Sequence, residues 1–138
     1  MDGAARRIAV AVVLDRGRVL VGLRSPDAAD APSLHEFPGG KVESREAPAA
    51  AAQREVREET GLEVTIGPLL DKASAVSRSG PIEIIFLAAQ PVDTSAVPLP
   101  PFEWVPIDRL AELTFPAANR RVLERIWQET TRSCHGGS

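Results

Sequence analysis

The chain has 138 residues, a formal net charge of −3 and a single cysteine, Cys134. This length predicts one domain over residues 1–132, large enough to bury a core, followed by a flexible tail over 133–138. The acidic balance offers no basic surface for duplex nucleic acid, so we expect no nucleic-acid partner. The apolar run 8–14 is too short to span a membrane, and the lone cysteine and lack of a signal peptide fit a reducing cytoplasm.

Taken in chain order, apolar runs separated by turn residues predict a series of short strands and two helices. The expected strands cover 8–14, 19–23, 35–42, 63–66, 71–77, 82–88 and 102–107. The expected helical segments cover 47–60, a short turn at 108–113 and an amphipathic helix at 117–130. Residues 94–101 are rich in proline and predict an extended connector. Strands around two helices indicate a mixed α/β layered domain.

The first helix carries a cluster of acidic side chains. Glu55, Glu58 and Glu59 are spaced i, i+3 and i+4, so they share one helix face. Such a face is either simply solvated or holds a cation, because clustered carboxylates repel one another. Carboxylate oxygens are hard ligands that suit Mg²⁺ or Mn²⁺. The Gly39-Gly40 turn that ends the preceding strand favours the metal site.

The segment from Gly40 to Leu62 resembles the Nudix box, Gly-x5-Glu-x7-Arg-Glu-(aliphatic)-x-Glu-Glu-x-Gly-(aliphatic). Every defined position is filled, by Gly40, Glu46, Arg54, Glu55, Val56, Glu58, Glu59, Gly61 and Leu62. A match at nine positions occurs by chance on the order of once in 10¹⁰ starting points at average residue usage. The resemblance implies an α/β/α sandwich with a central mixed sheet, and a Mg²⁺-dependent hydrolase in which Mn²⁺ can substitute.

Two further segments resemble the MutT-like branch of that family, whose members clear oxidised guanine nucleotides. The first is Glu36–Lys41, and the second is Phe115–Asn119, in which Ala117 replaces a proline. The resemblance implies that Asn119 hydrogen-bonds the base, with Phe37 and Pro116 beside it. It also implies that Arg24 and Lys41 contact the phosphates. From its position alone, Asn119 is better explained as a helix cap, whereas Phe37 could equally be a core residue and Arg24 a surface residue.

The resemblance also implies the catalytic roles. Glu58 and Glu59 would hold the metal with help from Glu55 and the Gly39 carbonyl, and Arg54 would orient the acidic groups. Relatives often supply another glutamate from the loop before the last strand, but residues 95–102 contain no acidic side chain. Glu103 is the nearest candidate, and it is otherwise an exposed strand residue. The general base is therefore Glu55 or Glu103.

The reaction expected from this resemblance is hydrolysis of a nucleoside triphosphate to nucleoside monophosphate and pyrophosphate, with 8-oxo-dGTP as the favoured substrate. Alternative substrates are CTP or dCTP, ADP-ribose and nucleotide sugars. A non-catalytic nucleotide-sensing module on the same fold is a further alternative. We expect a monomer or homodimer that acts on a small molecule, without membrane or nucleic-acid partners. The sequence does not determine the number of metal ions.

Overall fold

The computed structural model describes residues 6–27 and 33–136, with side chains as far as residue 128. Its strands are β1 (Arg6–Asp15), β2 (Arg18–Leu23), β3 (His35–Glu36), β4 (Gly39–Lys41), β5 (Val64–Ser77), β6 (Gly80–Pro91) and β7 (Glu103–Pro106). Its helices are α1 (Pro48–Thr60) and α2 (Arg120–Gly136), with 3-10 turns η1 (Ile107–Glu112) and η2 (Ala117–Asn119). No helix of the described chain is long and apolar enough to cross a membrane.

Strand β1 organises the sheet because three other strands pair with it. The order is β3-β2-β1-β6-β5, with β4 on β1 and β7 on β2. On one edge, β1 pairs with β6 in parallel. On the other edge it pairs antiparallel with β4 through its first half and with β2 at its end. The predicted central mixed sheet is therefore confirmed.

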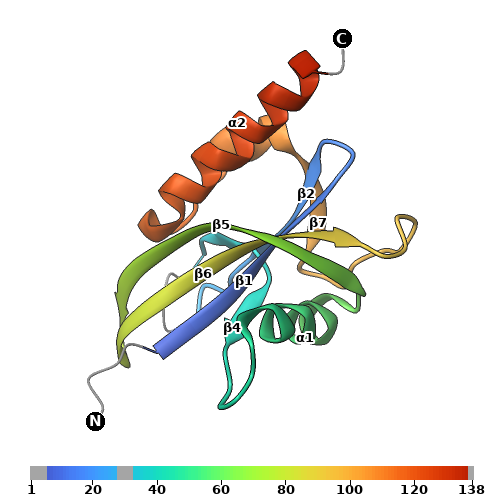
Figure 1. Cartoon of the computed structure of the whole chain (residues 1–138). Coiled ribbons are helices and arrows are strands. Elements are labelled where there is room, and N and C mark those ends of the chain that lie inside the picture. Colours follow the sequence, from blue (N-terminus) through green and yellow to red (C-terminus); the bar gives the residue numbers. More distant parts are fainter. Residues whose placement is uncertain (1–5, 28–32, 137–138) are drawn as a thin grey trace.

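The helices cover opposite faces of this sheet, as Figure 1 shows. Alternate residues of β1 point to opposite faces, so the strand contributes to two separate cores. Ala9, Ala11 and Val13 belong to the cluster that contains Ala51, Ala52 and Val56 of α1. Val12 belongs to the cluster that contains Val122 and Ile126 of α2. Burying an aliphatic side chain of this size contributes about 1.5–3 kcal/mol, so both layers depend on this alternation.

Helix α1 begins and ends as its sequence predicts. Ala47 at its N-terminal boundary makes no side-chain capping bond, and Pro48 occupies the first turn. Gly61 adopts the left-handed conformation with a φ of 79°, and its N–H donates to the carbonyl of Arg57. Glycine takes this conformation without a steric penalty, which explains where the helix stops.

Three predicted strands differ from those in the structure. The predicted strands 63–66 and 71–77 merge into one continuous strand, β5, which begins at Val64 and in which Gly67-Pro68 falls within register shifts between Ile66 and Asp71. These irregularities accommodate a proline, which has no N–H to donate to the ladder. The predicted strand 35–42 is divided into β3 and β4. Between them, the Pro38 carbonyl accepts the Ala11 N–H at 2.9 Å. The segment thus changes its pairing partner from β2, which pairs with β3, to β1, which pairs with β4.

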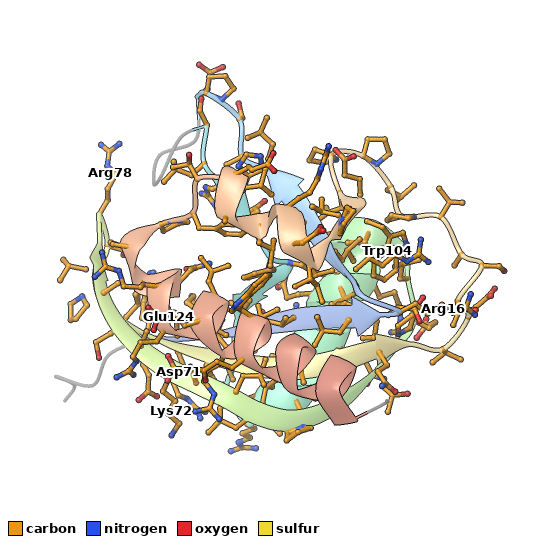
Figure 2. All side chains as sticks on the ribbon, turned by 90° about the horizontal axis from the view of Figure 1, so that it is seen from above. Arg16, Asp71, Lys72, Arg78, Trp104 and Glu124 are labelled. Carbon is orange, nitrogen blue, oxygen red and sulfur yellow. The ribbon has the colours of Figure 1, made fainter. Side chains whose placement is uncertain are left out.

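The last helix starts later than predicted because a 3-10 turn precedes it. The Asn119 N–H donates to the Pro116 carbonyl at 2.9 Å, and α2 begins at Arg120. Arg121 then anchors α2 to β5 by hydrogen bonds to the Asp71 carboxylate and to the Lys72 carbonyl, the latter at 2.7 Å. Figure 2 shows Asp71 and Lys72 beside this helix, with Glu124 further along it.

Candidate active site

Two adjacent glycines bring β4 close to α1. Gly39 and Gly40 pair with Val10 and Ala9 of β1. A methyl group on Gly39 would overlap the Ala9 carbonyl oxygen, and a methyl group on Gly40 would overlap the Glu55 carboxylate. Glycine is needed at both positions because neighbouring atoms fill the space of a side chain. Glu55 therefore lies directly against the backbone of β4.

Arg54 links the loop after β4 to the acidic face of α1. Its guanidinium forms a two-pronged contact with Glu46, at 2.9 and 3.0 Å, and donates to Glu55 at 2.9 Å. It also reaches Glu58 at 3.4 Å and the Lys41 carbonyl at 3.0 Å. Hydrogen bonding from Arg54 lowers the pKa of Glu46 to about 2, and the same contacts raise the pKa of Arg54. A planar guanidinium held in this way fixes the carboxylates in defined orientations.

Glu59 is a carboxyl group of this cluster whose pKa is strongly raised. Burial raises its pKa to about 7, and the charges of Glu55, Glu36 and Glu58 raise it further. The Gly39 N–H donates to its Oε1 at 3.1 Å, which opposes the shift. At neutral pH without a cation, this group is therefore close to half protonated. A positive ion among these carboxylates would favour the ionised form.

The donor set suits a hard divalent cation. Among the described residues, no three acidic, histidine or cysteine side chains converge into a preformed metal cage. Mg²⁺ does not require one, since it usually takes one or two carboxylates and completes its shell with water and phosphate oxygens. Glu59, Glu58 and Glu55 supply the carboxylates, and Arg54 neutralises part of their charge in the metal-free protein. The residues present fit Mg²⁺ or Mn²⁺.

A cavity of about 460 Å³ opens beside Gly39 on the α2 side of the sheet. Val10 and Phe86 form part of its floor, and Phe37 and Pro116 form part of its walls. This volume lies within the range of about 300–1,000 Å³ that is typical of small-molecule sites. Gly39 thus borders both the acidic cluster and the cavity.

Asn119 and Phe37 both line this cavity and are both buried. Asn119 is 8% exposed, and its amide makes no hydrogen bond to another residue of the described chain. The capping alternative for Asn119 therefore has no side-chain bond to support it. Phe37 is 4% exposed and stacks on Phe115 with ring centroids 4.9 Å apart. Phe37 is thus a core residue that also borders the cavity.

The structure does not bring three other predicted site residues together: they are Arg24, Lys41 and Glu103. Arg24 lines the cavity and forms an ion pair with Glu36 at 2.9 Å. The Lys41 side chain is exposed at the end of β4. Glu103 is exposed and borders a separate cavity of about 370 Å³ with Arg109, and the structure does not bring it to the acidic face of α1.

Two acidic residues at the acidic cluster and the cavity, Glu46 and Glu36, had no site role predicted from the sequence. Glu46 was recognised as a motif position, but its partner Arg54 is eight residues away on a helix. Glu36 precedes Phe37 directly, and its partner Arg24 lies twelve residues away, just after the end of β2. The pattern of charges along the sequence does not reveal either pair, because each depends on how separate elements pack.

The profile of the NUDIX domain family matches residues 5–126. The chain belongs to the NUDIX domain family. The family assignment made from the Gly40–Leu62 motif is confirmed, and the motif is the glycine turn, loop and helix described above.

Two characterised relatives align with part of this Nudix chain. A CTP pyrophosphohydrolase of Escherichia coli K12 is 46% identical over 59 residues, 42% of this chain and 43% of that protein. An 8-oxo-dGTP diphosphatase of Proteus vulgaris is 38% identical over 71 residues, 51% of this chain and 63% of that protein. The matched segments thus span less than two thirds of either relative.

Two solved structures share the fold of this protein over nearly the whole chain. The MutT protein from Methanosarcina mazei Go1 superposes with a TM-score of 0.75 at 22% identity, covering 94% of this chain and 98% of that one. A protein from E. coli, ORF135, has a TM-score of 0.72 at 24% identity, covering 90% and 89% of the two chains. At these identities the likeness establishes a shared fold.

Replacing Gly40 should disturb the acidic cluster without unfolding the protein. In Gly40→Ala the new methyl group displaces the Glu55 carboxylate, so we expect nucleotide hydrolysis to fall by about tenfold or more, the loss of about 1.4 kcal/mol of transition-state stabilisation. Gly67→Ala is the matched control, since its methyl group would meet only ordinary contacts near Ala88. Steady-state kinetics and thermal melting of both variants check this. Equal activity in the two variants would contradict the role given to Gly40.

The raised pKa of Glu59 predicts how pH affects the metal-free protein. The folded state binds this proton more tightly than the unfolded chain, so its contribution to stability is complete below pH 4.5 and is lost as pH rises through about 7. Between about pH 5 and 8, the Tm of the metal-free protein should fall more than that of Glu59→Gln. A divalent cation at this cluster would favour the ionised form, so Mg²⁺ should raise the wild-type Tm more at about pH 8 than at about pH 5. Identical profiles for the two proteins would show that Glu59 does not titrate in this way.

Proposed function

We propose that the protein hydrolyses a nucleoside triphosphate to nucleoside monophosphate and pyrophosphate with the help of Mg²⁺, and that its substrate is an oxidised purine nucleotide such as 8-oxo-dGTP. The position of Gly39 is the observation that carries this proposal. Its N–H binds Glu59 in the acidic cluster, and the same residue borders the 460 Å³ cavity. A nucleotide needs this combination, because its phosphates bind cations while its base needs a largely apolar pocket.

In this proposal the metal is held by Glu58 and Glu59, with Glu55 and the Gly39 carbonyl beside them. When bound, Mg²⁺ neutralises phosphate charge and lowers the pKa of a coordinated water, and Mn²⁺ can replace it. Lys41 is exposed one residue beyond Gly40, where its ammonium group can contact the phosphates. These roles come from the resemblance and are supported by the arrangement around Gly39.

We assign the role of general base to Glu55. Its carboxylate accepts a hydrogen bond from Arg54 at 2.9 Å, and the Gly40 backbone confines it, so its orientation is fixed before substrate binds. A positioned carboxylate takes the proton of the attacking water in the transition state. Glu103 borders a different cavity and is not part of this assignment. Arg54 acts as the positioning residue for Glu55.

The base would lie in the cavity between Phe37 and Asn119, with Pro116 alongside. An amide offers a donor and an acceptor together, as does the edge of 8-oxoguanine with its protonated N7 beside O6. One of the two relatives acts on 8-oxo-dGTP and the other on CTP. The segments that they share with this chain support an oxidised purine nucleotide and also a cytidine nucleotide. A cytidine nucleotide is therefore the second candidate substrate.

The proposed activity is tested by metal dependence. With 8-oxo-dGTP, turnover should require Mg²⁺ or Mn²⁺ and stop in EDTA. Glu58→Gln should lose on the order of a hundredfold in kcat, because it removes a carboxylate that holds the metal in this proposal, and the metal stabilises the developing charge. Glu124→Gln, an exposed change on α2, is the matched control and should keep full activity. Full turnover in EDTA, or an unaffected Glu58→Gln, would refute the metal site.

The substrate assignment is tested at Asn119. Losing a buried amide that pairs with a base edge weakens binding by about 1–3 kcal/mol, so Asn119→Ala should lower kcat/KM for 8-oxo-dGTP roughly 10- to 100-fold. Hydrolysis of CTP should fall much less. Gln90→Ala removes an exposed amide on β6 and is the control. A lower Tm with equal losses on all nucleotides would identify Asn119 as structural, and a wild-type preference for CTP or ADP-ribose would overturn the oxidised-purine assignment.

A further inference from the structure

The cavity beside Gly39 carries an ion pair in its wall. Arg24 follows β2, and Glu36 is the second residue of β3, which pairs antiparallel with β2. The Arg24 N–H also donates to the Leu34 carbonyl at 2.9 Å, so the two strands hold these residues side by side. The guanidinium of Arg24 donates to Oε1 of Glu36 at 2.9 Å. Their side chains are 33% and 27% exposed, so both are partly removed from water.

Glu36 offers a kind of hydrogen bonding that the Asn119 amide of the same cavity does not. The Asn119 amide both donates and accepts, whereas an ionised carboxylate only accepts. A carboxylate has about four acceptor positions on its two oxygens, and the hydrogen bond from the Arg24 guanidinium uses one of them. The remaining acceptors of Glu36 can therefore serve N–H groups of a bound base.

We propose that Glu36 is a specificity-determining residue that selects bases carrying an exocyclic amino group. This inference rests on the proposed function. The two candidate substrates, an oxidised guanine nucleotide and a cytidine nucleotide, share this amino group, at C2 of the purine and at C4 of the pyrimidine. Hypoxanthine has no amino group at C2, and uracil has a carbonyl oxygen at C4 that a carboxylate repels. A hydrogen bond to a charged acceptor is stronger than one between neutral groups. Hypoxanthine and uracil cannot form this bond with Glu36, so they are selected against.

Arg24 acts as the positioning residue for Glu36. An unpaired carboxylate in the cavity wall would repel the negatively charged triphosphate, and the guanidinium offsets that charge. The same contact restricts the rotation of the Glu36 side chain, because both partners come from neighbouring strands. The family resemblance implies a phosphate contact for Arg24. Its ion pair in the cavity wall points instead to a role at the base.

The first test uses the wild-type enzyme with Mg²⁺ and two matched substrate pairs. The kcat/KM values are measured for dGTP against dITP and for dCTP against dUTP. We expect the amino nucleotide to be preferred by about tenfold or more in at least one pair, as for a site that hydrogen-bonds a substrate N–H. The pair that shows the preference identifies the base as purine or pyrimidine. A preference below tenfold in both pairs contradicts the proposal.

The second test assigns the preference to Glu36. Glu36→Gln keeps the size of the side chain but replaces one acceptor by an N–H₂ donor. It should reduce the preference to about threefold or less by raising KM for the amino nucleotide. The KM for the amine-free nucleotide should change by less than about threefold. Glu83→Gln on β6 is the control, because Glu83 does not border the cavity. An unchanged preference in Glu36→Gln would overturn the assignment.

Variants of Arg24 separate positioning from general stability. The amino preference should decrease from wild type to Arg24→Lys to Arg24→Met, because lysine keeps the charge but not the forked geometry. A purely structural role would lower the Tm and leave the preference intact, which counts against the proposal. If Glu36→Gln fails to fold, the wild-type comparison still tests the amino preference, and the Arg24 variants test whether it depends on the Arg24–Glu36 pair. If no nucleotide is hydrolysed with Mg²⁺, the proposed function fails, whereas hydrolysis without amino preference refutes this inference alone.

Discussion

The contact between Arg54 and Glu46 is the constraint on which the site depends. It joins the loop after β4 to the middle of α1 by two short hydrogen bonds. The same guanidinium holds Glu55 and reaches the Lys41 carbonyl, so loop, strand end and helix are fixed together. Together with the hydrogen bond from the Gly39 N–H to Glu59, this connection holds the Gly39-Gly40 backbone against the acidic helix face. A network of charge-assisted hydrogen bonds at one residue can hold loop, strand and helix together, because each contact restricts the others.

The sheet separates two environments that a nucleotide requires at the same time. On the α1 side, carboxylates crowd around Glu59, and burial raises the pKa of that group to about 7. On the α2 side, aromatic and aliphatic residues line a cavity with a buried amide, Asn119. Strand β4 is only three residues long, and Gly39 within it borders both regions. Because Gly39 has no side chain, its backbone packs closely against β1 and contacts both regions.

The sequence predicted most of the fold, and the acidic face of α1, for identifiable reasons. Helix α1 has local signals at both ends, Pro48 and Gly61, and its acidic face follows from helical spacing alone. The single strand β5 was predicted as two, because Gly67-Pro68 normally interrupts a strand and the bulge that accommodates it depends on β6. The Arg24–Glu36 pair was not predicted, since it requires β2 and β3 to be adjacent. Local patterns thus identify elements, but they do not show which side chains of different elements meet.

The most direct test of this account is to locate the metal by anomalous scattering in a crystal of the full chain with Mn²⁺ and a non-hydrolysable analogue of 8-oxo-dGTP. The account predicts an anomalous peak within coordination distance of Glu59 and the Gly39 carbonyl, with the phosphates on the ion. It also predicts the base in the cavity between Phe37 and Asn119. An ion bound away from α1, for example in the cavity that contains Glu103, or a base outside the cavity, would contradict it.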